Sequence, residues 1–508
     1  MLAKTLMIQG TASSVGKSML VTALCRIFKQ DGFRVAPFKS QNMALNSFVT
    51  KSGGEMGRAQ VVQAEAAGIE PDIDMNPILI KPEAGSRAQI VVLGKPIMTV
   101  TAGEYGRQAT QLLSIAEKSL ARLRSAYDIV VIEGAGSPAE INIKDNEIVN
   151  MRIARLAGAP VLLVGDIDKG GVFASLVGTL ALLDEAERNS VKGLIINKFR
   201  GDIALLQPGL DYLESYTAKP VIGVIPYYHD ILISQEDSIF SVDKPGAEKA
   251  GGSVTIAVIH FPHLSNSTDF EPLQQEVGVV VQYVGSVAEL GYPDAIILPG
   301  SKSTVADLAY LWRSGLAEGI MQRARNGTPL VGICGGFQML GREIKDPCGV
   351  ESGDGDVAGL GLLDITTVFQ QQKTTCQVKA QVICNEGLLE GLRGEEVTGY
   401  EIHMGQTTGN NTEPLFLITQ KAEGQANYID GAVANGGLIF GSYLHGLFDN
   451  SNFRRVFLSK LRQRKGLSLT PGQPIPSRQE QYDRLADIVR RSLNLKLVYK
   501  ICGVGDAY

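Results

Sequence analysis

The sequence predicts an α/β protein with two doubly wound, mainly parallel-sheet domains followed by a short helical C-terminal tail. Two observations support this: apolar runs of strand length alternate with helical patterns up to about residue 225, and a second such series begins at Val254. The chain is also long, because 508 residues exceed what a single core usually contains. Near-continuous apolar strands separated by helices are typical of a parallel sheet covered on both faces.

The first domain is expected over residues 1–241. Its apolar runs predict six strands, at Thr5–Gln9, Phe33–Pro37, Asp128–Ile132, Pro160–Val164, Val191–Ile196 and Val221–Val224. Apolar residues at helical spacing predict helices at Gly16–Gln30, Tyr105–Arg124 and Val172–Glu187.

A linker is expected over residues 242–253, where the alternation of strand and helix patterns stops and the sequence reads Asp-Lys-Pro-Gly-Ala-Glu-Lys-Ala-Gly-Gly. The second domain is expected over residues 254–463, with strands at Val254–Ile259, Ala295–Leu298, Leu330–Ile333 and Gly437–Ser442. The tail, residues 464–508, contains a polar helical segment at Gln479–Asn494. We expect this tail to pack on the second domain or to be partly mobile.

Composition narrows the class of protein. The net charge is −5, so general binding to nucleic acid through a basic surface is not expected. The six cysteines form no Cys-x-x-Cys pair, which disfavours a zinc site or a disulfide framework and suits a reducing cytosol. An apolar strand begins almost at once without a signal peptide, and no apolar run approaches membrane-spanning length. We expect a cytoplasmic protein without a membrane partner.

A phosphate-binding loop directly follows the first strand. It reads Gly10-Thr-Ala-Ser-Ser-Val-Gly16-Lys17-Ser18 and leads into a helix. Backbone N–H groups there face bound anions, the lysine reaches the β/γ-phosphates and the serine hydroxyl is placed for Mg²⁺. Five residues rather than the common four separate the two glycines. The predicted nucleotide-binding residues are Thr11, Gly16, Lys17, Ser18 and Asn197, although Asn197 could equally form a strand-end turn.

Two carboxylates follow strands of the same predicted sheet. Glu133 ends the strand before Gly134-Ala-Gly136, and Asp166 follows the strand Val161–Gly165. Carboxylates at this edge lie over the crevice where Mg²⁺ would be held. We predict Ser18 and Glu133 as metal ligands with Asp166 as the second carboxylate, whose alternative role is a helix cap.

The loop after the second strand lies over the same crevice and predicts an acid-binding surface. It contributes one cation and several amide groups, which suit a carboxylate or amide on a large substrate. A further lysine ends the run Met75–Lys81, although a solvated lysine is the alternative. The predicted substrate-binding residues are Lys39, Gln41, Asn42, Asn46 and Lys81.

The second domain carries a candidate nucleophile, Cys334, in the run Pro329-Leu-Val-Gly-Ile-Cys-Gly-Gly-Phe-Gln-Met-Leu340. A strand turns sharply into a helix there, which exposes the thiol and favours its thiolate. The glycines, Gly335 included, let backbone amides approach an oxyanion. His445, beyond the last apolar strand, is the predicted base, and His403 is the competing histidine. A buried structural cysteine is the alternative.

Both halves resemble known families. The phosphate loop and Glu133-Gly-Ala-Gly136 resemble the dethiobiotin synthetase group, which phosphorylates a carbon-based acid. The Gly-x-Cys-x-Gly elbow and downstream histidine resemble class I glutamine amidotransferase domains, a resemblance that implies oxyanion amides at Gly300 and Ser301 after Pro299. One departure is Leu447, because most such domains carry Glu two residues after the histidine. The group that orients the imidazole is therefore missing or supplied elsewhere.

Motif order along nearly the whole chain resembles the cobyric acid synthase family of the cobalamin pathway. The matching stretches include Pro37–Asn46, Met75–Pro82, Gly165–Phe173, Asn197–Asp202, Leu298–Thr304 and Gly399–Gly405. The resemblance implies a glutamine-hydrolysing amide ligase that uses ATP and Mg²⁺. Its implied acceptor is a corrinoid acid, adenosylcobyrinic acid a,c-diamide, amidated at the b, d, e and g carboxylates.

Two rival interpretations stay open at the level of sequence. One is the related synthase that forms cobyrinic acid a,c-diamide and shares this architecture. The other is a P-loop regulatory ATPase with an inactive amidotransferase domain, for which Leu447 is the best sequence support. Regulatory ATPases of that type carry an extra lysine early in the phosphate loop, where this chain has Thr11, Ala12, Ser13 and Ser14.

Overall fold

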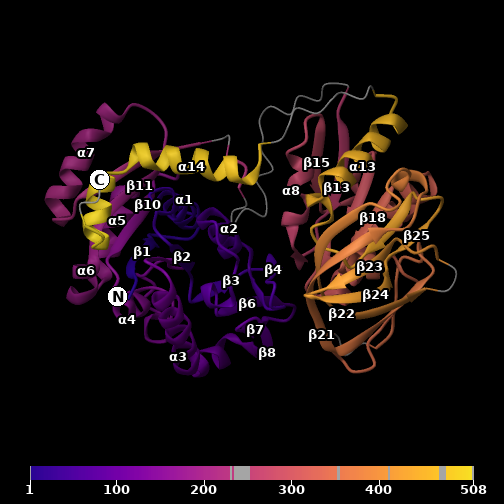
Figure 1. Cartoon of the computed structure of the whole chain (residues 1–508), viewed down its shortest axis with the longest axis horizontal. Coiled ribbons are helices and arrows are strands. Elements are labelled where there is room, and N and C mark those ends of the chain that lie inside the picture. Colours follow the sequence, from indigo (N-terminus) through magenta and orange to yellow (C-terminus); the bar gives the residue numbers. More distant parts are fainter. Residues whose placement is uncertain are drawn as a thin grey trace.

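The structure is a computed structural model that describes residues 2–228, 231–233, 252–351, 355–409, 412–467 and 476–505. Two α/β halves lie side by side (Figure 1). The first half has a six-stranded sheet in the order β12-β11-β10-β1-β9-β2, in which every neighbouring pair is parallel. Its strands are β1 (Lys4–Gly10), β2 (Val35–Phe38), β9 (Ile129–Glu133), β10 (Val161–Asp166), β11 (Val191–Phe199) and β12 (Val221–Pro226). The six strands predicted for this domain are confirmed.

Alternate residues of these strands enter cores on opposite faces of the sheet. Leu6 and Ile8 pack in one buried cluster, whereas Met7 packs in another. This is why the strands read as continuous apolar runs. The covering helices are α1 (Lys17–Gln30), α2 (Arg58–Ala67), α3 (Ala102–Ala126), α4 (Met151–Ala157), α5 (Val172–Leu182), α6 (Glu185–Ser190) and α7 (Ile203–Thr217).

The helix predicted at Val172–Glu187 is two helices. The side chain of Asp184 accepts a hydrogen bond from Glu187 N at 2.8 Å, and the Glu187 carboxylate accepts one from Asp184 N at 3.0 Å. This capping box starts α6 afresh after α5 ends.

A small sheet that the sequence analysis did not predict lies between β2 and α3. Its four strands are β3 (Gln41–Met43), β6 (Ile78–Glu83), β7 (Arg87–Val92) and β8 (Lys95–Thr101), and a two-stranded ribbon of β4 (Ser47–Val49) and β5 (Glu55–Gly57) accompanies it. These strands carry the predicted residues Gln41, Asn42 and Lys81 toward the second half of the molecule.

The second half contains the predicted parallel sheet, in the order β15-β13-β16-β18-β26-β25. All its pairs are parallel except the edge pair β25–β26. The strands are β13 (Val254–Ile259), β15 (Val279–Val284), β16 (Ala295–Leu298), β18 (Leu330–Ile333), β25 (Ala432–Ala434) and β26 (Ile439–Ser442). The helices are α8 (Glu271–Gln274), α9 (Val287–Leu290), α10 (Thr304–Arg313), α11 (Leu316–Arg325), α12 (Gly335–Leu340) and α13 (Ser451–Arg464).

A second, mostly antiparallel sheet is inserted between β18 and β25. It is built around two long paired strands, β21 (Ile365–Val382) and β22 (Glu396–Gly409). Its other strands are β19 (Glu343–Lys345), β20 (Val357–Ala358), β23 (Phe416–Lys421) and β24 (Gly424–Asp430). Toward both ends of β21, buried positions alternate with partly or fully exposed ones, so the strand lacks the apolar runs by which the parallel strands were found.

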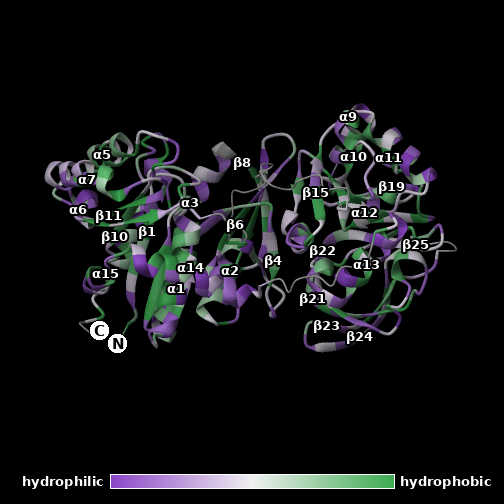
Figure 2. Cartoon of the chain, turned by 90° about the horizontal axis from the view of Figure 1, so that it is seen from above, coloured by the Kyte–Doolittle hydropathy of each residue, from purple (hydrophilic) through white to green (hydrophobic). Residues whose placement is uncertain are grey.

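The expectation that the tail packs on the second domain is wrong. Helix α14 (Arg478–Ser492) lies beside α1 in the first half (Figures 1 and 2). Leu485, Ala486 and Val489 are buried in the core that α1 shares with the main sheet. Helix α15 (Leu495–Cys502) extends this contact. The other domain limits stay predictions, and residues 242–251 of the predicted linker lie outside the described residues.

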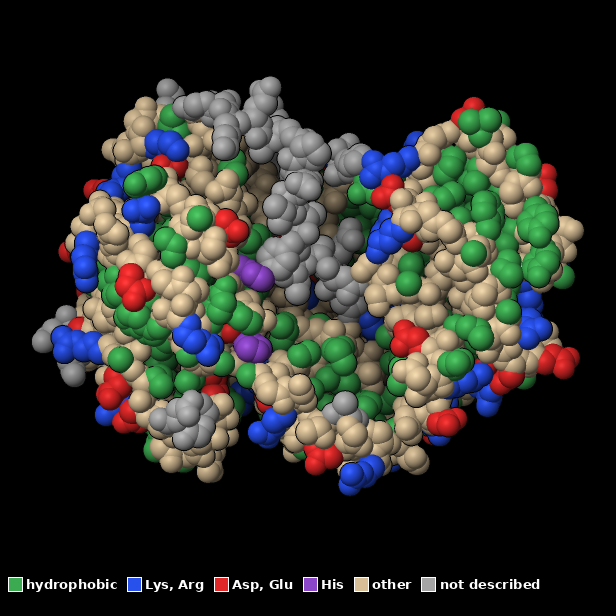
Figure 3. Space-filling model, turned by 180° about the vertical axis from the view of Figure 1, so that it is seen from behind, with side chains coloured by type: hydrophobic (Ala, Val, Ile, Leu, Met, Phe, Trp, Pro, Cys, Tyr) green, Lys and Arg blue, Asp and Glu red, His purple; other side chains and the backbone are tan. Residues whose placement is uncertain are grey.

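On the face seen in Figure 3, acidic and basic side chains are interspersed over both halves. The negative net charge is therefore not gathered into one patch on that face. Across the described ranges, no helix combines the length and apolar character needed to cross a membrane.

Candidate active site

The thiol of Cys334 lies at a sharp bend between β18 and α12. The residue has φ 49° and ψ −107°, a left-handed conformation that is costly for a residue with a side chain. The bend is tight because a Cβ at Gly336 would lie 2.0 Å from the carbonyl oxygen of Leu298. The side chain is 7% exposed, and its Sγ lies 3.4 Å from the carbonyl oxygen of Ile402. The elbow predicted from the glycines is therefore present, but the thiol is buried rather than exposed as the sequence analysis expected.

His445 faces this thiol from the end of β26. Its ring is close enough to the Cys334 side chain for that thiol to affect its pKa, and its Nδ1 lies 2.7 Å from Asp269 Oδ2. The other oxygen of Asp269 accepts a hydrogen bond from Gly446 N at 3.0 Å. Burial alone would lower the pKa of His445, but Asp269 and Cys334 raise it to about 10. A carboxylate thus orients the imidazole and stabilises its protonated form.

Asp269 supplies the orienting group that Leu447 does not. It belongs to a short 3-10 helix, η3 (Ser267–Phe270), between β13 and α8. The sequence analysis missed it because it lies 176 residues before His445. The available signal was the polar run Ser265–Asp269, in which the structure buries every residue except Thr268.

The ring of His445 is held on further sides. Tyr400 stacks on it with a centroid distance of 5.3 Å and an interplanar angle of 17°. The Nδ2 of Asn266 lies 3.3 Å from Nδ1 and 3.4 Å from Nε2. Sequence reasoning did not single out either residue.

The predicted oxyanion residues lie around the same point. A Cβ at Gly335 would meet Ser301 N at 2.9 Å, and a Cβ at Gly300 would meet the His445 ring at 3.0 Å. The loop that contains Gly300 and Ser301 therefore packs closely against Gly335 and the His445 ring, which suits backbone amides that would stabilise an oxyanion. The oxyanion role stays a prediction.

The competing histidine, His403, is engaged elsewhere. Its ring stacks on Tyr443 with a centroid distance of 3.7 Å, and its Nδ1 lies 2.8 Å from the carbonyl oxygen of Gly405. Its Nε2 lies 3.9 Å from Glu401. The geometry favours His445 as the partner of Cys334.

In the first half, the phosphate loop lies between β1 and α1, as predicted. Lys17 Nζ donates to the carbonyl oxygens of Ala12 and Gly136 at 2.9 and 3.2 Å. The side chain of Asn197 donates to Val15 O at 2.8 Å, and a Cβ at Gly16 would lie 2.1 Å from it. Only a glycine fits there, with φ 100°. Asn197 thus supports the loop, and its contact with the base stays a prediction.

Glu133 lies beneath the loop at the end of β9 and is fully buried. It accepts hydrogen bonds from Ser18 Oγ at 2.8 Å, from Lys39 Nζ at 3.0 Å and from the Gln63 amide. Burial alone would raise the pKa of Glu133, but Lys39 and the hydrogen bonds lower it. A hydroxyl and an ionised carboxylate side by side suit Mg²⁺, which takes few protein ligands and completes its shell with phosphates and water.

The third predicted metal ligand, Asp166, has other partners. Its Oδ2 lies 2.9 Å from Lys198 Nζ, and its Oδ1 accepts a hydrogen bond from Asp168 N at 2.9 Å. Lys198 also donates to Ser14 O of the phosphate loop at 2.6 Å. Among the described residues, no cluster of three or more His, Cys, Asp or Glu side chains could hold a metal by itself.

The predicted substrate-binding residues already have protein partners. Lys39 pairs with Glu133, Gln41 contacts Tyr105, and Asn42 donates to Gln60 Oε1 at 2.9 Å. Asn46 Oδ1 accepts a hydrogen bond from Ser267 N at 2.9 Å, across the boundary between the halves.

Lys81 pairs with the buried carboxylate of Glu55, which Lys373 of β21 also contacts at 2.6 Å. Burial lowers the pKa of Lys81 to about 8, although Glu55 opposes that effect. Because its charge is already paired with Glu55, Lys81 is less suited to binding an acid than the sequence suggested.

Family models match both halves of the chain. A CobQ/CobB/MinD/ParA nucleotide binding domain covers residues 6–239, and a CobB/CobQ-like glutamine amidotransferase domain covers residues 255–453. The cobyric acid synthase of Dehalococcoides mccartyi (strain CBDB1) is 55% identical over 504 residues, which are 99% of this chain and 100% of the relative. The chain belongs to the cobyric acid synthase family.

Other cobyric acid synthases match as fully. That of Sorangium cellulosum is 53% identical over 517 residues, and that of Desulforamulus reducens is 52% identical over 508, each across 99% of both chains. This member of the family is therefore an ATP-dependent, glutamine-dependent amide ligase. The interpretation as a regulatory ATPase is not favoured, and the Asp269–His445 contact removes the argument that Leu447 gave for it.

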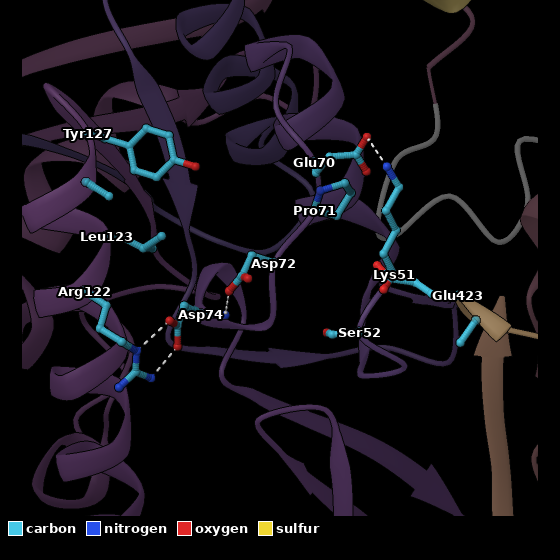
Figure 4. A pocket seen from close by; sticks show the side chains of 12 residues that line it. Lys51, Ser52, Glu70, Pro71, Asp72, Asp74, Arg122, Leu123, Tyr127 and Glu423 are labelled. Carbon is cyan, nitrogen blue, oxygen red and sulfur yellow. Dashed lines mark hydrogen bonds and ion pairs between the residues drawn. The ribbon is translucent and has the colours of Figure 1, made fainter.

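A cleft of about 860 Å³ in this cobyric acid synthase family member lies where the halves meet, since Ala422 and Glu423 of the second half join residues of the first half in its lining (Figure 4). Lys51 pairs with Glu70 at 2.8 Å on one side, and Arg122 pairs with Asp74 on the other. None of the predicted site residues lines it. With Asp72 and Glu423 also in the lining, carboxylates outnumber cations, which suits an acidic substrate poorly.

Proposed function

We propose that this protein converts adenosylcobyrinic acid a,c-diamide to adenosylcobyric acid. Glutamine provides the nitrogen, and ATP with Mg²⁺ drives amidation of the b, d, e and g carboxylates. The observation that carries the proposal is the presence, in one chain, of the Cys334–His445–Asp269 constellation and a phosphate loop over Glu133. The full-length match to cobyric acid synthases supports the corrinoid acceptor.

In the amidotransferase half, the sulfur of Cys334 attacks the side-chain amide of glutamine. The protonated imidazole beside it favours the thiolate, and amides of Gly335 and Ser301 stabilise the oxyanion. His445 gives its proton to the departing ammonia, which leaves a thioester on Cys334. The neutral imidazole then takes a proton from water, the resulting hydroxide attacks the thioester carbonyl, and cleavage of the C–S bond releases glutamate and restores the Cys334 thiolate beside protonated His445. Asp269 keeps the ring in the orientation that these transfers need.

In the nucleotide-binding half, the acceptor carboxylate attacks the γ-phosphate of ATP to give an acyl phosphate and ADP. Lys17 and the loop amides would stabilise charge on the phosphates, and Ser18 with Glu133 would hold Mg²⁺, which would supply further positive charge there. Ammonia displaces phosphate from the acyl phosphate to form the amide. Because ammonium is no nucleophile, transfer between the halves must be sheltered from water.

A cytoplasmic setting stays a prediction. The five cysteines buried in the described chain and exposed Cys348 are all free thiols, which suits a reducing compartment.

Replacing the nucleophile tests the proposal. Cys334→Ala should abolish amidation driven by glutamine, because no other group forms the thioester. It should leave amidation with added ammonium salts near the unaltered rate, since the nucleotide-binding half is intact. Product formation is measured by chromatography with each nitrogen source. Loss of both activities would mean that Cys334 is structural, and retention of both would contradict its role as nucleophile.

A further inference from the structure

One short segment of the nucleotide-binding half reaches the glutamine site. Asn46 Oδ1 accepts hydrogen bonds from Ser267 N at 2.9 Å and Ser267 Oγ at 3.3 Å. Ser47 N donates to Asn266 Oδ1 at 2.9 Å, and Ser47 O accepts from the Tyr400 hydroxyl at 3.3 Å. Ser47 is fully buried and begins β4, which faces β21 and β22 in Figure 1.

The residues that this segment contacts are those that hold His445. Because Ser47 N fixes the oxygen of the Asn266 amide, the amide nitrogen is directed at the imidazole. Tyr400, anchored on Ser47, stacks on the same ring. Ser267 opens the 3-10 helix that presents Asp269. Both the face and the Nδ1 edge of the ring are thus supported from the other half.

The support is firmly anchored. Lys81 Nζ lies 3.1 Å from Ser47 Oγ and pairs with Glu55, which also pairs with Lys373 of the amidotransferase half. The side chain of Gln377 donates to Val49 O at 2.8 Å. Buried charged hydrogen bonds of this kind fix one geometry, because breaking them leaves an unpaired buried charge.

The stretch of chain that leads to Asn46 and Ser47 also contacts the nucleotide site. Lys39, a few residues before Asn46, pairs with the buried Glu133 beneath the phosphate loop. A single stretch of chain, residues 39–47, therefore contacts the nucleotide-site carboxylate at one end and the supports of His445 at the other. A displacement of Lys39 can therefore be transmitted to Ser47 through the backbone, and a displacement of Ser47 can be transmitted to Lys39.

We propose that Asn46 and Ser47 are positioning residues for glutamine hydrolysis, through which the nucleotide-binding half holds Asn266, Tyr400 and Asp269 against His445. This inference rests on the proposed function. It assigns Asn46 to the control of the glutamine site rather than to direct contact with the corrinoid acid. Glutamine hydrolysis then reaches its full rate only when Asn46 and Ser47 keep their contacts with the amidotransferase half.

The test is steady-state glutamine hydrolysis by the full chain, measured with and without ATP and the corrinoid acid. Asn46→Leu removes the acceptor at similar size, and we expect kcat to fall at least ~10-fold with KM for glutamine little changed, because a small displacement of a catalytic group has effects of this order or larger. Asn46→Asp keeps the acceptor and should restore most of kcat. Tyr400→Phe keeps the stacked ring but loses the contact with Ser47, so it should give a smaller fall.

The matched control is Glu83→Gln, which removes the charge from the 2.6 Å ion pair between Glu83 and Lys302 across the same boundary. It should hydrolyse glutamine as the unaltered chain does. Thermal midpoints verify that every variant is folded.

Ammonium-driven amidation by Asn46→Leu distinguishes a role of Asn46 in positioning His445 from a role in binding the corrinoid acid. If Asn46 binds substrate, that activity falls while glutamine hydrolysis stays within about twofold of the unaltered rate, which overturns this inference alone. If the unaltered chain shows no Cys334-dependent hydrolysis under any of these conditions, the proposed function fails and this inference fails with it.

Discussion

Asp269 is the residue that changes the interpretation of the amidotransferase site. The position two residues after the histidine is Leu447, which is buried and apolar. A carboxylate from another element, that of Asp269, lies 2.7 Å from Nδ1 of the imidazole. Orientation of a catalytic histidine depends on geometry, so a carboxylate from any part of the chain serves equally well.

Removing this carboxylate should slow glutamine hydrolysis. Asp269→Asn keeps the shape but removes the charge, so we expect kcat with glutamine to fall at least ~100-fold. The pKa of His445, raised to about 10 in the unaltered protein, should also fall. Because protonated His445 gives its proton to ammonia, activity is lost as pH rises through this pKa. The alkaline limb of the pH–rate profile should therefore move to lower pH.

An alkaline limb at the same pH in Asp269→Asn and in the unaltered chain would contradict this role of Asp269. Ammonium-driven amidation by the same variant is the control, because it does not use His445.

Lys17 tests the other centre at the same scale. Lys17→Ala removes the cation expected on the ATP phosphates, so amidation should fall at least ~100-fold with glutamine and with ammonium alike. Glutamine hydrolysis measured without ATP should persist. Initial rates of amide formation and of glutamate release, taken on the same preparation, distinguish these effects. Normal amidation would remove the phosphate-loop assignment.

Residues with local signals were predictable from the sequence, and those defined by distant contacts were not. Cys334 is marked by its own neighbours, because glycines on both sides allow its bend. Glu133 is marked by its position at a strand end. Asn266, Asp269 and Tyr400 have no such pattern, since their roles exist only after three separate segments meet at His445.

At the scale of elements, apolar runs identified the strands of both parallel sheets. They did not identify β21 and β22, because strands with one exposed face carry polar residues at every second position. The tail helix was predicted, but its location was not. The apolar residues of α14 have the spacing of an ordinary amphipathic helix. That spacing predicts a buried face but does not indicate which helix it packs against.

The tail should contribute to the stability of the nucleotide-binding half. Leu485 of α14 is fully buried against that core, so Leu485→Ala should lower the free energy of unfolding by about 3 kcal/mol. Arg484→Ala, at an exposed position of the same helix, is the matched control. Denaturant unfolding followed by circular dichroism measures both. Equal stability of the two variants would contradict the packing of α14 on α1.

At the scale of the whole molecule, two reaction centres lie in separate halves that share a buried boundary. Glu55 is the clearest sign of this sharing, because lysines from both halves pair with it. The boundary brings Asn46 and Ser47 to the supports of His445. Ammonia formed at Cys334 is thus released beside the half that activates the acceptor.

The central claim is that a glutamine-hydrolysing thiol and a phosphate loop act together on a corrinoid acid. Mass spectrometry of the product tests it most directly, with adenosylcobyrinic acid a,c-diamide, ATP, Mg²⁺ and glutamine carrying a heavy nitrogen isotope in its side-chain amide. We predict that the b, d, e and g acids become amides that carry the label. An unchanged acceptor, or amides without the label, would contradict the account.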